Sequence, residues 1–129
     1  MSTPSKPATV VSWVAQLAAV VILAMAGFMK LSGAPDSVAL FETLGADPLG
    51  RYAVGALEVI AVLLLIRPAT AAWGGLLALG LMAGAIGTHL FKIGIAYPGD
   101  GSLFMMATVV FVAAAIVTWL RRGQLPFGR

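Results

Sequence analysis

The chain has 129 residues, of which 60% are hydrophobic and only 10% are charged, and its formal net charge is +3. Soluble domains are about half apolar and about a quarter charged, so this composition excludes both an ordinary water-soluble globule and a disordered chain. The sequence contains no cysteine and one histidine, which excludes disulfides, thiolate sites and any multi-histidine metal or haem site within one chain. We therefore expect a small, all-α, polytopic membrane protein without a metal centre.

The basic residues do not cluster in the way that nucleic-acid binding requires. Most of them stand singly along the sequence, and only Arg121 and Arg122 are adjacent. A nucleic-acid surface needs a clustered basic face, whereas single basic residues beside apolar runs are typical of the ends of membrane-spanning helices. The sequence thus indicates a lipid bilayer as partner and argues against nucleic acid.

The first expected element is a membrane-spanning helix over residues 10–29. About 20 residues, at about 1.5 Å each, cross a hydrocarbon layer of about 30 Å. Lys6 before this run, and Ala24-Met25-Ala26, which resembles a cleavage site, also fit a secretory signal peptide. The run is long for the apolar part of a signal peptide, so we expect the helix to be retained.

A short helix is expected next, over about residues 37–44. The segment 33–35, Gly-Ala-Pro, ends the first helix, and Asp36 or Ser37 is placed to cap the second. One face of this segment is apolar, and Gly45 closes it. Because so short a helix cannot cross a bilayer, we predict an interfacial helix between the first and second spans.

Three further spans are expected, at about residues 48–66, 69–91 and 103–120. Asp47 followed by proline is typical of a helix N-terminus. Ser102 follows a turn-rich segment that includes Pro98, and is placed to cap the last span. Together with the first span they predict a four-helix membrane bundle.

An even number of spans places both termini on one side of the membrane, and we treat residues 1–129 as one membrane domain. The basic residues divide unequally, with five on this terminal side (Lys6, Arg67, Arg121, Arg122, Arg129) and three on the opposite, Lys30 side (Lys30, Arg51, Lys92). The positive-inside rule then predicts a multi-pass protein of the plasma (inner) membrane with cytoplasmic termini.

Glu58 is the most informative residue because it lies well inside the second span. A carboxyl group at that depth is expensive unless it faces the bundle and has a partner. Arg51, Gly55 and Glu58 share one helical face, and Lys30 and His89 end neighbouring spans at the same membrane level. We therefore predict a ligand-binding pocket formed by Glu58, His89, Lys30 and Arg51.

Structural roles for the same residues remain open at this point. Glu58 with Lys30 or Arg51 could be an ion pair that sets the helix register, and His89 could be wetted by lipid headgroups. Two further patterns concern packing alone. Gln16 is expected to form a hydrogen bond between helices, and the glycines at 80 and 84 have the spacing that favours close helix contact.

A quinone would fit the predicted pocket. His89 and a basic residue would donate to its ring carbonyls, and Leu57, Ile60 and Met82 would flank its tail. Four ionisable groups at one level also need water or a polar ligand. We accordingly expect a polar-headed cavity on the Lys30 side and none on the terminal side.

A set of short segments occurs in a characteristic order along the chain. They are Trp13 with Gln16-Leu17, Gly27-Phe28-Met29-Lys30-Leu31, the loop helix from Pro35 to Gly45, Gly55-Ala56-Leu57-Glu58, and Met82-Ala83-Gly84-Ala85 leading to His89. In this order the chain resembles the DoxX/DoxX-like family of small four-helix bacterial membrane proteins, from about Trp13 to Leu120.

The resemblance implies a plasma-membrane four-helix bundle associated with redox chemistry. The family's name derives from a subunit of a thiosulfate:quinone oxidoreductase, and relatives are linked to membrane oxidoreductase complexes and redox-stress responses. This sequence has no cysteine, so thiol chemistry does not transfer to it. A redox role would need a bound quinone or the cofactor of a partner subunit.

Three functions remain open from the sequence. The first is a small membrane subunit associated with a quinone-linked oxidoreductase system. The second is a non-catalytic structural or assembly subunit, which packs against other subunits of a larger membrane complex or against copies of itself. The third and least favoured is a small transporter, because the membrane glutamate of small multidrug transporters lies in the first span and Glu58 lies in the second. The sequence holds no self-sufficient catalytic constellation, so it leaves open whether the protein is an enzyme.

Overall fold

The computed structural model describes residues 5–97 and 99–127. Pro98 of the expected turn and Arg129 of the charge count lie outside these residues. The described residues form five α-helices and no strand, and the structure is 84% helical. Four of these helices are long and apolar enough to cross a membrane. The expected fold class is therefore confirmed, including the short helix between the first two spans.

The helix bounds differ from the sequence-based ones mainly at the ends. The five helices are α1 (Lys6–Ser32), α2 (Pro35–Thr43), α3 (Leu49–Ile66), α4 (Ala71–Thr88) and α5 (Ser102–Leu120). Three short helical turns adjoin them: η1 (Pro68–Thr70), the π-helical turn η2 (His89–Ile93) and η3 (Arg122–Gln124). The first span is longer than expected at both ends, and the third is divided into η1, α4 and η2.

The expected caps of α2 and α3 are wrong. Ala34 is the cap residue of α2 and no side chain bonds to its first turn, because Pro35 occupies the first helical position and has no N–H to satisfy. Pro48 precedes α3, again without a side-chain cap. The Asp47 carboxylate accepts a hydrogen bond from Arg51 Nε instead.

The start of α5 also differs from the expectation. Gly101, at φ +78°, is the cap residue of α5, and Ser102 is its first helical residue. The backbone N–H of Ser102 donates to Asp100 Oδ1 at 3.0 Å. This hydrogen bond stabilises the charged carboxylate and holds the pKa of Asp100 below its ordinary value.

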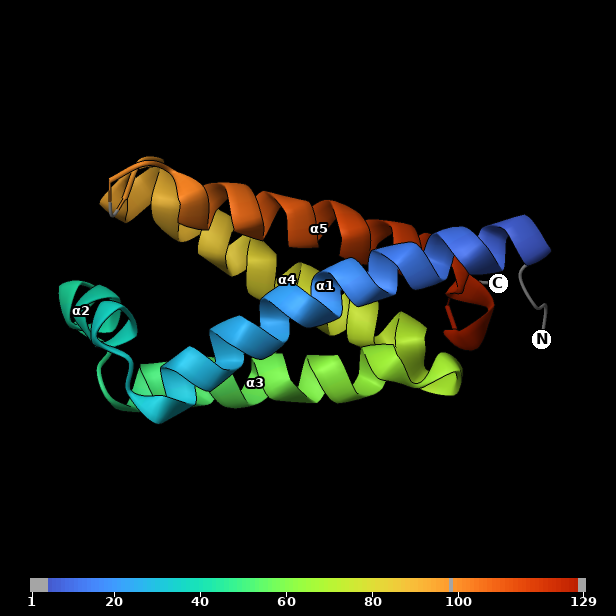
Figure 1. Ribbon diagram of the computed structural model, residues 1–129, viewed down its shortest axis with the longest axis horizontal. Helices are drawn as coiled ribbons and strands as arrows, with labels where there is room; N and C mark the ends of the chain where they lie inside the picture. Colours follow the sequence, from blue (N-terminus) through green and yellow to red (C-terminus); the bar gives the residue numbers. More distant parts are fainter. Residues whose placement is uncertain (1–4, 98, 128–129) are drawn as a thin grey trace.

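The four long helices form a closed ring of neighbours. Helix α1 packs against α3 and α5, and α4 packs against the same two helices. Figure 1 shows that the α1–α3 pair and the α4–α5 pair diverge toward the end where α2 lies. The start of α1 and the turn η3 lie at the other end, which is the terminal side.

Small residues fill the interior and large apolar residues face outward. Each long helix contributes a fully buried alanine: Ala19, Ala61, Ala78 and Ala114. Large side chains are exposed on the outer faces, among them Val14, Phe28, Leu63, Met105 and Val112. A soluble bundle would bury such side chains, whereas lipid accepts them and small residues let the helices approach closely. The bundle therefore contacts the lipid bilayer.

The close contact of α4 with its neighbours depends on a different glycine pair from the expected one. A Cβ atom at Gly74 would lie 2.7 Å from the Leu65 backbone nitrogen, and one at Gly75 would lie 2.5 Å from Thr118 Oγ1. A Cβ atom at Gly80 or at Gly84 would meet no described atom within 4 Å. The expectation for residues 80 and 84 is thus wrong for contacts within this chain, because those glycines lie on the outer face.

Candidate functional site

Two glycines let α1 and α3 approach closely at the predicted site. A Cβ atom at Gly27 would lie 3.2 Å from the Gly55 carbonyl oxygen, and one at Gly55 would lie 2.9 Å from Lys30 Cβ. The space that a side chain would occupy is therefore filled by the neighbouring helix. This close approach places Lys30 of α1 beside Glu58, one turn further along α3.

Lys30 and Glu58 form a buried ion pair. Lys30 Nζ lies 3.0 Å from Glu58 Oε1, and the two side chains are 15% and 3% exposed. The two atoms are close enough for a salt bridge, but the angle is poor for a hydrogen bond, and Oε1 has no aligned donor among the described residues. The charge of Glu58 is thus balanced within the bundle.

Arg51 joins the end of α1 to the start of α3. Its Nε donates to Asp47 Oδ1 at 2.5 Å and its Nη1 donates to the Lys30 carbonyl oxygen at 2.6 Å. Its guanidinium also lies over the Tyr52 ring, 4.5 Å from the centroid. Arg51 thereby satisfies one of the carbonyl groups that the last turn of α1 leaves without a helical partner.

His89 is buried with one ring nitrogen unpaired. The residue is 5% exposed, and Nδ1 lies 2.9 Å from the Ala85 carbonyl oxygen. A carbonyl only accepts, so Nδ1 carries the hydrogen, and Nε2 of the neutral ring is an acceptor. Nε2 is enclosed and has no partner among the described residues. With Nδ1 as the donor, Nε2 offers an acceptor, whereas the sequence predicts a donor at this position.

The surroundings of His89 are an aromatic ring and an irregular helical turn. The ring of Phe104 on α5 lies 5.7 Å from that of His89 in an edge-to-face arrangement. His89 is also the first residue of η2, and its carbonyl accepts from Gly94 in a wide turn of the π-helical kind. Such turns interrupt a helix at a stability cost and are frequent at functional sites.

The structure brings three of the four predicted site residues together. Lys30, Arg51 and Glu58 are joined by the ion pair and by the hydrogen bond from Arg51 to the Lys30 carbonyl. The recorded partners of His89 are instead Ala85 and Phe104. Lys30, Arg51 and Glu58 thus form an ionic cluster, and among the described residues no hydrogen bond or ion pair links His89 to it.

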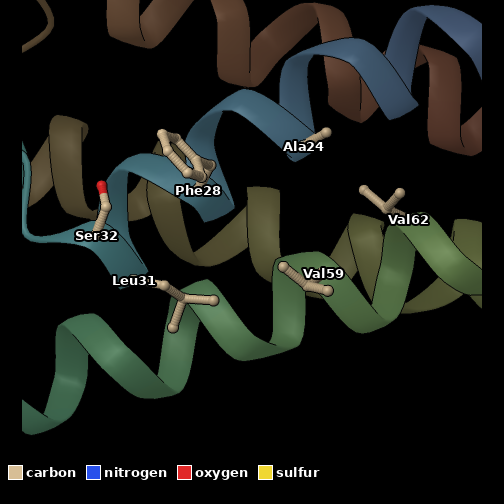
Figure 2. A pocket seen from close by; sticks show the side chains of 6 residues that line it. All are labelled: Ala24, Phe28, Leu31, Ser32, Val59 and Val62. Carbon is tan, nitrogen blue, oxygen red and sulfur yellow. The ribbon is translucent and has the colours of Figure 1, made fainter.

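A shallow apolar groove lies along the seam between α1 and α3. Its volume is about 430 Å³, and Figure 2 shows the side chains that line it: Ala24, Phe28, Leu31, Ser32, Val59 and Val62. None of the four predicted site residues lines this groove, and Ser32 is its one polar side chain. It is therefore not the polar-headed cavity that the sequence predicted. Of the predicted tail contacts, Leu57 and Ile60 are 39% and 45% exposed, whereas Met82 is buried.

A buried polar network that includes Gln16 lies on the terminal side. Arg121 Nε donates to Ser12 Oγ at 2.8 Å and to Gln16 Oε1 at 3.0 Å. Ser12 Oγ donates to Gln16 Oε1, and Gln16 Nε2 donates to the Leu65 carbonyl, both at 2.6 Å. The interhelical role predicted for Gln16 is confirmed. Ser12 and Gln16 stand four residues apart on one helical face, which was the sequence signal for this network.

Arg121, which follows the last residue of α5, keeps its positive charge although it is buried. Desolvation lowers the pKa of its guanidinium below the ordinary value. Arginine nevertheless stays protonated in proteins. The network therefore holds a positive charge in a poorly solvated place.

The family model described as the DoxX-like family matches residues 14–112. No curated protein and no solved structure matches the chain. Among the described residues, no group of three or more histidine or acidic residues could hold a metal ion. The match runs from Val14 within α1 to Val112 within α5 and so includes the ionic cluster, His89 and the groove.

Proposed function

The chain belongs to the DoxX-like family, and from that premise we propose that it is a membrane subunit of a quinone-linked redox system. In this role it holds the reduced, hydroxyl-bearing form of a quinone at His89. Electrons pass through the cofactor of a partner subunit, since this chain offers a binding group and no self-sufficient catalytic set. The four candidate spans support this proposal, because an isoprenoid-tailed quinone partitions into the bilayer that such spans cross.

The unpaired Nε2 of His89 is the observation that carries this proposal. A buried acceptor without a donor costs about 1–3 kcal/mol, and His89 Nε2 has no donor among the described residues. A quinol hydroxyl would donate to it, and the neighbouring Phe104 ring would flank the quinol ring. The oxidised quinone has only carbonyl acceptors, so the neutral imidazole favours the reduced form.

The ionic groups on the Lys30 side support a binding role over an enzymatic one. Glu58 is paired with Lys30, and Arg51 is bound to Asp47 and to a backbone carbonyl. General acid–base catalysis needs a group within hydrogen-bond reach of the reacting atom. These groups already have internal partners, so their role is to hold α1 against α3.

A His89→Ala substitution is expected to reduce the quinol content of the purified protein about 5- to 10-fold, since it removes one buried hydrogen bond. The measurement is the amount of quinol extracted per mole of protein from native membranes under reducing conditions. Thr88→Val is the matched control, because the Thr88 hydroxyl bonds within its own helix to the Gly84 carbonyl.

Equal quinol content in wild type and in the His89→Ala protein would contradict the quinol site. The structural or assembly subunit would then be the better function. One observation favours that second candidate: the internal Lys30–Glu58 pair sets the register of α1 and α3 without any ligand. The proteins that co-purify in mild detergent distinguish the two roles, because an assembly subunit retains the same partners in the His89→Ala form.

We also infer that the protein lies in the plasma membrane with its termini in the cytoplasm. Five of the eight basic residues are on the terminal side and three are on the Lys30 side. This asymmetry favours a cytoplasmic terminal side.

A topology assay in a bacterial host tests the orientation. Alkaline phosphatase, which is active only after export, should be inactive when fused after residue 129 and active when inserted at Gly99 between α4 and α5. A fluorescent protein that folds only in the cytoplasm should give the reverse pattern. Phosphatase activity at the C-terminal fusion alone would contradict the proposed orientation.

A further inference from the structure

Arg121 is a charged residue buried at the terminal-side end of the bundle. It is 6% exposed, and its Nε–H is shared between Ser12 and Gln16 of α1. The guanidinium also lies 5.9 Å from the ring centroid of Trp13. A guanidinium has five N–H groups, so Nε accounts for one of them and the fork formed by Nη1 and Nη2 accounts for the other four.

No acidic side chain of this chain is placed to neutralise Arg121. The five acidic residues of the whole sequence lie in or beside α2 and α3, or in the loop before α5, toward the other end of the bundle. No carboxylate lies within 4.0 Å of the guanidinium among the described residues. A buried charge is costly without a partner, so the counter-charge must come from outside these side chains.

The fork of Arg121 is open to such a partner and is held in place. Within the described part of the chain, Nη1 and Nη2 donate no hydrogen bond, and neither atom is both enclosed and unpaired. Gln16, which accepts from Nε, is itself anchored to the Leu65 carbonyl on α3. The guanidinium orientation is therefore set by two helices before any ligand binds.

Arg121 lies at the depth of the lipid headgroups in the membrane. Three tryptophans accompany the terminal-side residues: Trp13 near Arg121, Trp119 near Arg122, and Trp73 near Phe127. Tryptophans gather at the membrane–water interface, where phosphate groups are abundant. A planar guanidinium fork binds phosphate oxygens through two parallel hydrogen bonds.

We propose that Arg121, oriented by Ser12 and Gln16, binds the phosphate group of an anionic phospholipid on the terminal side of the membrane. The lipid supplies the missing negative charge, and its acyl chains lie along the apolar outer surface of the bundle. This site is independent of the quinol site, because His89 lies toward the opposite end. Free phosphate offers the same chemistry, and competition with inorganic phosphate separates the two sources.

The test is native mass spectrometry of the full chain in detergent, titrated with phosphatidylglycerol, phosphatidylcholine or inorganic phosphate at equal concentrations. The wild type should retain phosphatidylglycerol in preference to phosphatidylcholine, whose choline group offsets its phosphate charge. Arg121→Gln should weaken phosphatidylglycerol binding about 10-fold, which is the effect of losing a charged hydrogen-bond pair.

Arg122→Gln is the matched control, because this neighbouring arginine is exposed and lies over Trp119. It should weaken binding less than about 2-fold. Equal losses in the two variants would overturn the site and indicate diffuse surface charge. Displacement of the lipid by an equal concentration of inorganic phosphate would also overturn the lipid assignment.

Arg121→Lys is the conservative variant for the case in which Arg121→Gln fails to fold. Arg121→Lys retains the positive charge and loses the fork, so it should keep the fold and bind phosphatidylglycerol about 3-fold more weakly. Helical content by circular dichroism checks that the bundle is intact. Unchanged lipid binding by a folded Arg121→Lys protein would contradict a fork-shaped phosphate site.

Discussion

A Lys30→Met substitution is expected to destabilise the bundle by about 3–5 kcal/mol, because it leaves a buried carboxylate without its counter-charge. The Glu58 side chain is 3% exposed, and its one recorded ionic partner is Lys30. The carboxylate must then either stay charged in an apolar setting or take up a proton, and both are costly. The free energy of unfolding, measured by SDS titration in mixed micelles, gives the size of the effect.

Removing both members of the pair is expected to restore most of the stability. In the Lys30→Met/Glu58→Leu protein no buried charge remains unpaired, and an apolar pair of similar volume is often as stable as the ion pair. Glu58→Leu alone should cost less than Lys30→Met alone, because the long lysine side chain is 15% exposed and its ammonium group can extend toward water. Additive losses in the double variant would contradict a direct pair.

The second large effect is expected from Gly74→Ala, which should destabilise the bundle by about 3 kcal/mol. The added Cβ atom would lie 2.7 Å from the Leu65 backbone nitrogen and 2.9 Å from Leu64 Cβ. A backbone atom cannot rotate away as a flexible side chain does, so α4 must move away from α3. The same SDS titration measures the loss.

Gly80→Ala is the matched control on the same helix. Its Cβ atom would meet no described atom within 4 Å, and alanine is favoured over glycine in a helix by about 1 kcal/mol. We therefore expect Gly80→Ala to be neutral or stabilising. A loss in Gly80→Ala as large as that in Gly74→Ala would show that helix α4 packs through its outer face, against a second copy or another subunit.

Much of the fold follows from local patterns in the sequence. Apolar runs of sufficient length predict the spans, and the break at Gly33, where φ is +75°, separates α1 from a helix too short to cross the membrane. The face shared by Arg51, Gly55 and Glu58 is buried in the structure, as helical periodicity required. Gln16 lies within an apolar run, where an amide without a hydrogen bond is costly. This cost likewise predicted its hydrogen bond to another helix.

Local sequence patterns do not predict the helix starts and the packing surfaces as well. The side chain of Asp47 was suited either to cap α3 or to bind Arg51 four residues later, and local sequence does not decide between the two. The glycine pairs at 74–75 and 80–84 are equally small. Which pair meets a neighbouring helix depends on how α4 is rotated about its own axis, and that rotation is set by α3 and α5.

The sequence by itself determined that Glu58 must be inside and partnered, because a carboxyl group in lipid is expensive wherever the bundle places it. The tertiary structure alone decided the partner, since Gly27 and Gly55 bring Lys30 to it while Arg51 turns to Asp47. In the same way, Arg121 and Arg122 are indistinguishable as adjacent basic residues, and only one of them is buried. Its partner Ser12 lies 109 residues away, and a contact of that range exists only once α1 and α5 have packed side by side.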